Sequence, residues 1–177
     1  TNVDMSNRLI CFNIQSLGDQ LKPVAMLSML EYINTCVMSN ERNDPAAATW
    51  VYFDEIYLLL RDQLSAQFLY TSWKRFRKYN AYATGITQNV QDCLTNDTAY
   101  AMLANSEFVC MLRQTKDIDS VVELYGLSDP QKNYLKLAKP GQGILKMGNN
   151  LIPFVNDHPT NTKIYRLLTT KPGEMEN

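Results

Sequence analysis

Short apolar runs alternate along the chain with longer segments in which apolar residues recur every three or four positions. The short runs predict strands over residues 9–14, 49–53, 81–86 and 108–112. The longer segments predict helices over residues 23–40, 65–79 and about 90–104, joined by loops such as 40–46. Because the strands are too apolar to have one wet face, the alternation predicts an α/β fold with a mostly parallel sheet flanked by helices.

The pattern changes in the last third of the chain, where turn residues become frequent. Pro130 falls in the first turn of an expected helix, a position that tolerates proline, and Gly148 opens an expected turn. We expect helices over 120–125 and 129–137, a C-terminal β-hairpin over 144–154, a last strand over 163–168 and a frayed tail over 171–177.

Length and composition predict one compact domain, over residues 1–170. The chain has 177 residues, of which 45% are apolar, enough for a single core and too few for two comfortable ones. Its 17 basic and 18 acidic residues nearly cancel, so no overall field draws it to nucleic acid or to an anionic membrane. Any basic function must therefore be local.

Few residues are available for metal or triad chemistry. His158 is the one histidine, and the four cysteines have no short metal-binding spacing, which excludes a histidine metal site and a histidine-based triad. This cysteine usage favours a reduced, cytoplasmic protein. No apolar run approaches the ~20 residues that span a bilayer, so we expect membrane contact only through partners. The chain opens at Thr1 with an apolar run close behind, and we expect it to start inside a longer protein.

The strand over residues 49–53 ends in Asp54-Glu55. Nucleotide hydrolysis uses such a pair: the first acid holds magnesium or its water shell, and the second orients the attacking water. The alternative is that the two acids merely cap the following helix, where negative charge is stabilising.

A basic cluster, Lys74, Arg75, Arg77 and Lys78, lies between this strand and the next. One interpretation is a solvated helix end whose cations complement the helix dipole. The other is an arginine finger, whose guanidinium clamps a γ-phosphate bound to a neighbouring subunit. The next strand leads to Gln88, which could sense a γ-phosphate or place a water, or could simply be a turn residue.

The order and spacing of these motifs resemble a known family. The resemblance is carried by Tyr52–Glu55, Trp73–Tyr79, Thr84–Val90, Asn105–Phe108, Leu127-Ser128 with Gln131, and Pro140–Gly143. Together they are similar to hexameric RecA-like pumps such as conjugative coupling proteins and their HerA/FtsK relatives. More closely, they resemble the conjugation and type IV secretion ATPases that include TraC, TrsE and the fourth VirB protein.

This resemblance implies a RecA-like P-loop NTPase core and a motor that hydrolyses ATP with Mg²⁺ at the interfaces of a hexamer. It identifies Asp54 and Glu55 with the Walker B acids, Arg77 with the trans-acting finger and Gln88 with the sensor glutamine. Secondary finger candidates are Arg75, Lys74 and Arg113. The implied partners are further copies of the protein, other components of the secretion channel and a DNA or protein substrate, at the cytoplasmic face of the membrane.

The sequence departs from the family in one respect: it lacks the phosphate loop. No string of the form G-x-x-x-x-G-K-[ST] occurs in the 177 residues; in the nearest approach, Gly141–Gly148, the lysine precedes the last glycine. We therefore expect residues 1–170 to be the C-terminal portion of the motor domain, truncated at its N-terminus and inactive alone. The alternatives are a non-catalytic ATPase-like docking module and a DNA-translocating motor of the HerA/FtsK type.

Overall fold

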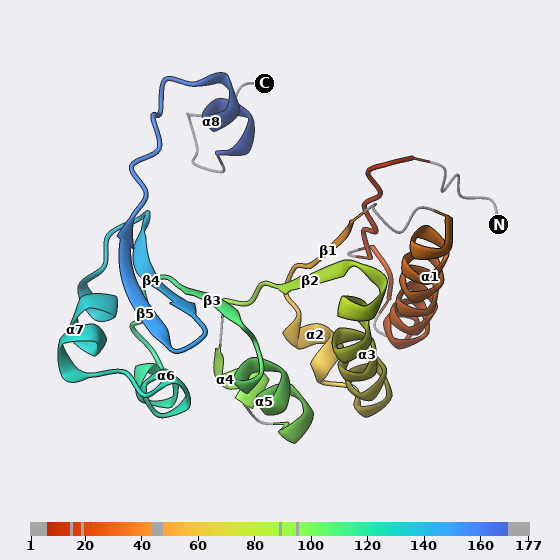
Figure 1. The fold of residues 1–177 in the computed structure, drawn as a ribbon, viewed down its shortest axis with the longest axis horizontal. Helices are drawn as coiled ribbons and strands as arrows, with labels where there is room; N and C mark the ends of the chain where they lie inside the picture. The colour runs from red at the N-terminus through yellow and green to blue at the C-terminus, as the bar shows by residue number, and fades with distance from the viewer. Residues whose placement is uncertain are drawn as a thin grey trace. The chain divides into compact units, whose positions relative to one another are not determined.

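The structure, a computed structural model, describes residues 7–14, 16–18, 20–43, 48–88, 90–94 and 96–169. They fall into two compact units, Thr1–Leu103 and Ala104–Asn177 (Figure 1). Each unit has its own sheet and its own helices. Whether the two belong to one motor-domain portion over residues 1–170 stays a prediction, and the expected frayed tail lies outside the described residues.

The first unit contains a parallel pair of strands with helices packed beside it. Its elements are α1 (Lys22–Asn43), β1 (Thr49–Phe53), α2 (Tyr57–Leu60), α3 (Gln63–Phe76), the 3₁₀ helix η1 (Arg77–Tyr79), β2 (Ala81–Gly85), α4 (Val90–Leu94) and α5 (Asp97–Ala104). β1 and β2 pair in parallel, in register from Thr49 opposite Ala81 to Phe53 opposite Gly85. The α/β class and both of these predicted strands are confirmed.

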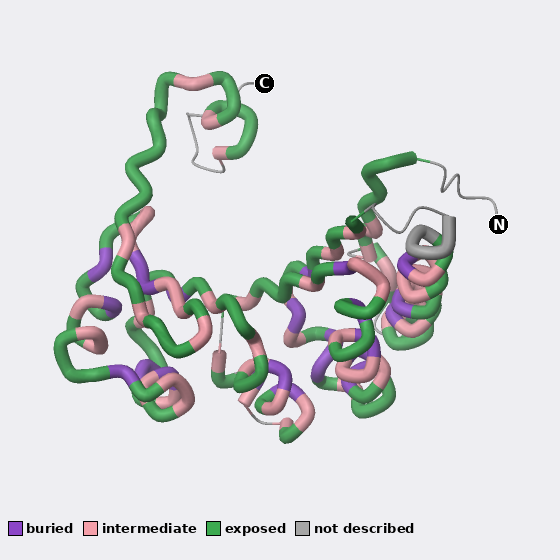
Figure 2. The backbone as a smooth tube through the Cα atoms, viewed as in Figure 1, coloured by how far each residue is buried: buried purple, intermediate pink, exposed green. Residues whose placement is uncertain are grey.

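Among the described residues of the first unit, only one face of this parallel pair is covered. Phe53 and Ala81 are buried, and Val51 and Ala83 are packed against the same cores. The cores are completed by helix residues, including Leu30 of α1 and Leu69 of α3, and the buried stretches of these helices are purple in Figure 2.

The opposite face of the pair is aromatic and open. Trp50, Tyr52 and Tyr82 are 60%, 64% and 48% exposed, and the Trp50 and Tyr82 rings stack with centroids 4.6 Å apart. Parallel sheets are ordinarily covered on both faces, so the described part of the first unit is only half of the layered arrangement that the sequence predicts.

The prediction of a strand over residues 9–14 is wrong. This segment is irregular, with bends near its start, and Leu9 is 91% exposed. The segment lies against α1 instead: Phe12 meets Tyr32 edge to face at 6.0 Å, and Ile14 packs on the core. Apolar side chains alone do not make a strand, because a strand needs a neighbouring strand to hydrogen-bond its backbone groups.

The end predicted for the first helix, near residue 40, is also too early, since α1 continues to Asn43.

The second unit has an antiparallel sheet in the order β3-β4-β5. Its elements are β3 (Phe108–Met111), α6 (Ile118–Tyr125), α7 (Asp129–Leu137), β4 (Gln142–Met147), β5 (Asn150–Val155) and α8 (Lys163–Leu168). The predicted hairpin is confirmed, with Met147 opposite Asn150 across a turn at Gly148, whose φ is 55°. β3 is a strand as predicted, but it pairs antiparallel with β4 and does not extend the parallel pair.

The last predicted strand, residues 163–168, is instead helix α8. Thr162 occupies the N-cap, and its hydroxyl accepts a hydrogen bond from the backbone N–H of Tyr165. Ile164, Leu167 and Leu168 follow a helical spacing, which the strand prediction overlooked. No helix in the part of the chain that the structure describes is both long and apolar enough to cross a bilayer.

Candidate functional site

The two predicted acids follow directly after the carboxyl end of β1. Asp54 is exposed and Glu55 is half-buried, so neither carboxylate is enclosed in the core. The Asp54 carboxylate accepts a hydrogen bond from the Glu55 backbone N–H at 3.1 Å. Glu55 has a φ of 50°, a left-handed conformation that non-glycine residues adopt rarely and that is often found at functional sites. The chain therefore turns sharply at the second acid.

Backbone hydrogen bonds tie this turn to the segment that follows β2. The Ile86 N–H donates to the Phe53 carbonyl at 2.8 Å, and the Ile56 N–H donates to the Ile86 carbonyl at 3.0 Å. The segments that follow β1 and β2 thus stay hydrogen-bonded to each other beyond the last paired residues of the two strands. Asp54 and Glu55 are held within this backbone ladder.

The ladder brings Gln88 to Glu55. The Gln88 side-chain Nε2 donates to Glu55 Oε1 at 2.7 Å, although the two residues are 33 positions apart in the sequence. The sequence indicated each residue separately and missed the contact between them. The available signal was topological, because the carboxyl ends of parallel strands lie at one edge of the sheet, where ligands bind in open α/β sheets.

The helix-capping interpretation of the two acids lacks a side-chain cap hydrogen bond, and only its charge–dipole form is left open. Ile56 is the N-cap residue of α2, and no side chain makes the cap hydrogen bond. Leu58 donates its backbone N–H to the Glu55 carbonyl, so that part of the turn is closed by main chain. The carboxylates of Asp54 and Glu55 are consequently left to other interactions.

Arg77 lies at the other end of the strands. It is the exposed first residue of η1, which leads into β2 at Ala81, opposite Thr49 at the start of β1. Five residues of strand at ~3.3 Å each separate the two edges by roughly 16 Å. Arg77 is therefore too far from Glu55 of its own chain to act on a phosphate bound there. A residue that acts on a neighbouring subunit is expected to lie in this way.

Lys74 and Arg75 are both in the last turn of α3 and exposed. The Lys74 ammonium lies over the Tyr70 ring, 4.1 Å from its centroid, a cation–π contact. Their exposure and their place at a helix end fit the solvated-helix interpretation of the cluster. Arg113, the remaining finger candidate, is exposed after β3 in the second unit.

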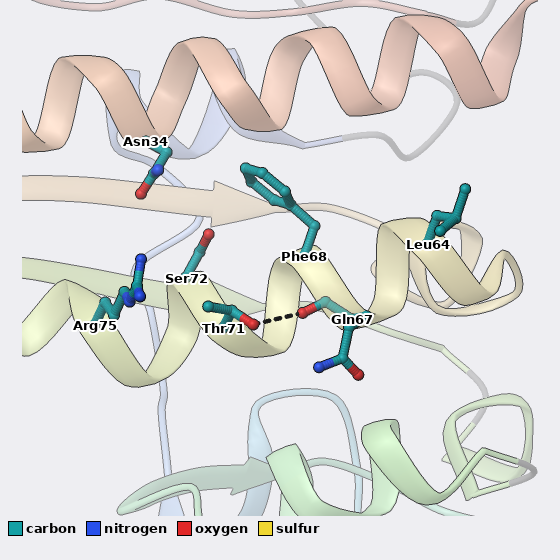
Figure 3. Close-up of a pocket in the computed structure, with 7 residues that line it drawn as sticks. All are labelled: Asn34, Leu64, Gln67, Phe68, Thr71, Ser72 and Arg75. Carbon is teal, nitrogen blue, oxygen red and sulfur yellow. Dashed lines mark hydrogen bonds between the residues drawn. The ribbon is translucent and has the colours of Figure 1, made fainter.

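Arg75 also lines a groove between α1 and α3 of about 320 Å³. Figure 3 shows Asn34 on α1 facing the α3 side chains, with the Thr71 hydroxyl donating to the Gln67 carbonyl. The lining side chains are Asn34, Leu64, Gln67, Phe68, Thr71, Ser72 and Arg75. None of the predicted acids or Gln88 is among them, so the groove is separate from the edge that carries Glu55.

The site's oxygen ligands suit magnesium. Among the described residues, no group of three or more His, Cys, Asp or Glu side chains comes together that could hold a metal by itself. Magnesium needs no such cage, because it keeps several waters and takes one or two carboxylates together with phosphate oxygens. Asp54 can provide such a carboxylate, directly or through the water shell, and Mg²⁺ bound there would neutralise charge on a phosphate.

The sequence matches one family model, the TraG P-loop domain, over residues 1–167. The chain belongs to the TraG P-loop domain family. Its resemblance to the conjugation and type IV secretion ATPases is thereby confirmed.

A solved structure supports the same assignment. The chain is similar to VirB4 of Thermoanaerobacter pseudethanolicus, with 26% identity and a TM-score of 0.71. The similarity covers 82% of this chain and 40% of the VirB4 chain, so the chain spans less than half the length of that relative. The RecA-like fold class is confirmed by this match. No curated protein matches the sequence.

Proposed function

We propose that this member of the TraG P-loop domain family is part of a motor ATPase that powers conjugative DNA transfer or type IV secretion. The observation that carries the proposal is the Glu55 carboxylate at the edge of a parallel sheet, in contact with Gln88 from the segment that follows β2. Family membership and the likeness to VirB4 support the same activity.

In this proposal each predicted residue has a distinct task. Asp54 holds Mg²⁺ or its water shell, and Glu55 orients the water that attacks the γ-phosphate. Arg77 comes from the adjacent protomer of a hexamer and stabilises the charge that develops on the transferred phosphoryl group. The ~16 Å between the two edges of the sheet supports this division, because one chain cannot place both Glu55 and Arg77 on the same phosphate.

The proposed partners follow from the family. They are further copies of the chain, other components of a type IV secretion channel and a DNA or protein cargo. We propose that the motor works at the cytoplasmic face of the membrane and reaches the membrane through these partners.

The 177-residue chain by itself is expected to bind ATP weakly and to leave it intact. Phosphate-loop contacts provide much of the nucleotide affinity in such motors, and the sequence has no such loop. Titration calorimetry with MgATP should give a dissociation constant weaker than micromolar. A micromolar constant would mean that this chain provides a phosphate site of another kind.

Mixing two inactive variants tests the proposal in the whole protein. Glu55→Gln should lower ATP turnover by roughly 10²–10⁴-fold, and Arg77→Ala by roughly 10³–10⁵-fold. When the two are combined in equal amounts before assembly, roughly a quarter of the head-to-tail interfaces pair an intact Glu55 with an intact Arg77. Turnover should therefore return to roughly a quarter of the unmodified rate.

Lys78→Ala is the matched control, since Lys78 is an exposed cation of the same 3₁₀ helix. It should retain turnover, and circular dichroism should show all variants folded. No recovery on mixing would refute action of Arg77 across an interface. If the unmodified whole protein does not hydrolyse ATP, the motor is refuted and the docking-module alternative takes its place.

A further inference from the structure

The contact between Gln88 and Glu55 has a defined direction. An ionised carboxylate can only accept hydrogen bonds, and the glutamine Nε2 can only donate. The 2.7 Å separation between Gln88 Nε2 and Glu55 Oε1 is at the short end for such a bond, as expected when the acceptor is charged. One oxygen of Glu55 is therefore engaged, and among the described residues no hydrogen bond to the other is present.

The backbone on both sides of this contact has little freedom. The bonds from Ile86 to Phe53 and from Ile56 to Ile86 hold the two segments together. Glu55 is kept at a φ of 50° between them, a conformation that persists only where the surroundings determine it. The carboxylate is left with its side-chain rotations alone, and the Gln88 amide restricts those.

We propose that Gln88 is a positioning residue for Glu55: its amide holds one carboxylate oxygen, so that the other is aimed at the attacking water. This inference rests on the proposed function. It assigns Gln88 an action through Glu55, whereas the family resemblance implies direct sensing of the γ-phosphate. The two roles differ in what Gln88 touches, since a sensor has to contact the nucleotide.

The contact itself can be tested without nucleotide in the 177-residue chain. In a ¹⁵N-labelled sample, Glu55→Ala should move the side-chain NH₂ resonances of Gln88. Glu123→Ala, the same change at an exposed glutamate of the second unit, should leave them in place. Unmoved Gln88 resonances in Glu55→Ala would overturn the inference, whatever the protein's activity.

Turnover by the whole protein then separates positioning from sensing. Gln88→Met keeps the length of the side chain and removes the amide. A loss of alignment is expected to lower kcat by about 10²-fold while the KM for ATP stays the same. Gln67→Met, the same change on the exposed side of α3, should have no effect.

Coupling between the two residues decides the outcome. If Gln88 acts through Glu55, adding Gln88→Met to Glu55→Gln should cause no further loss. A raised KM with unchanged kcat, or losses that multiply in the double variant, would overturn the inference and favour a sensor. Absence of turnover in the unmodified protein refutes the proposed function and this inference with it, whereas normal turnover in Gln88→Met refutes the inference alone.

Discussion

Gly85 gives the most direct test of how the site is packed. It is the last residue of β2 and lies opposite Phe53. A Cβ at this position would lie 2.6 Å from Ile56 Cδ1 and 3.4 Å from Ile56 Cγ2. Ile56 is 6% exposed and follows Glu55 directly. Gly85→Ala would therefore push a buried side chain at the turn that carries the second acid.

The expected cost is moderate. Overpacking a core typically destabilises by about 1–3 kcal/mol, and replacing a strand glycine with alanine recovers about 0.5–1 kcal/mol. The net loss for Gly85→Ala should be about 1 kcal/mol. Ile56→Val removes the clashing Cδ1 and alone costs about 0.5–1.5 kcal/mol. Because the new methyl then occupies the vacated space, the double variant should be about 1 kcal/mol more stable than the sum of the single changes predicts.

Urea denaturation followed by tryptophan fluorescence measures these differences. The chain has two tryptophans, Trp50 and Trp73, both in the first unit, so the signal reports the unit that contains Gly85. Ile33→Val is the control, because Ile33 packs on the same cores from α1, and its effect should simply add to that of Gly85→Ala. Strict additivity for Ile56→Val as well would refute the close contact.

Two further predictions concern charged side chains outside the site. Asp62 caps α3 by accepting the Ser65 backbone N–H at 2.9 Å, so Asp62→Ala should cost about 1 kcal/mol in urea denaturation, and Asp62→Asn less. That backbone hydrogen bond lowers the pKa of Asp62; its charged form therefore stabilises the fold above the unfolded pKa of about 3.9, and the contribution is lost as the pH falls through the folded pKa. The hydrogen bond from Lys132, followed by its charge, lowers the pKa of Asp119, so Lys132→Met should raise that pKa in a carboxyl NMR titration. Lys136→Gln should raise it less, since Lys136 acts only through its charge and more weakly; equal shifts would contradict the ion pair.

Local patterns were sufficient to predict much of the secondary structure and to select the candidate site residues one by one. The β-branched and aromatic run at 49–53 and the turn at Gly148 predicted β1 and the hairpin, because strand and turn preferences act within a few residues. The acids after β1 were found because a strand that ends in two carboxylates is a local signal. The family was found because a long ordered string is far more specific than any of its parts.

One part of the motif string, Pro140–Gly143, is explained by close backbone packing. Gly141 has a φ of 81°, and a Cβ there would lie 2.4 Å from the Asn156 carbonyl oxygen. A Cβ at Gly143 would lie 2.3 Å from the Met111 carbonyl oxygen. Both glycines allow neighbouring backbone to approach closely, so the Pro140–Gly143 motif belongs to the packing of the second unit.

Only the tertiary structure decided which strands pair and which side chains meet. Residues 9–14 and 108–111 are both short apolar runs. The first is irregular and the second joins an antiparallel sheet, because a strand exists only where another strand satisfies its backbone groups. The bond between Glu55 and Gln88 and the separation of Arg77 from both depend on β1 and β2 running parallel in one register. The sequence determined which chemical groups are present. Long-range hydrogen bonding, which no local window contains, determined which of them meet.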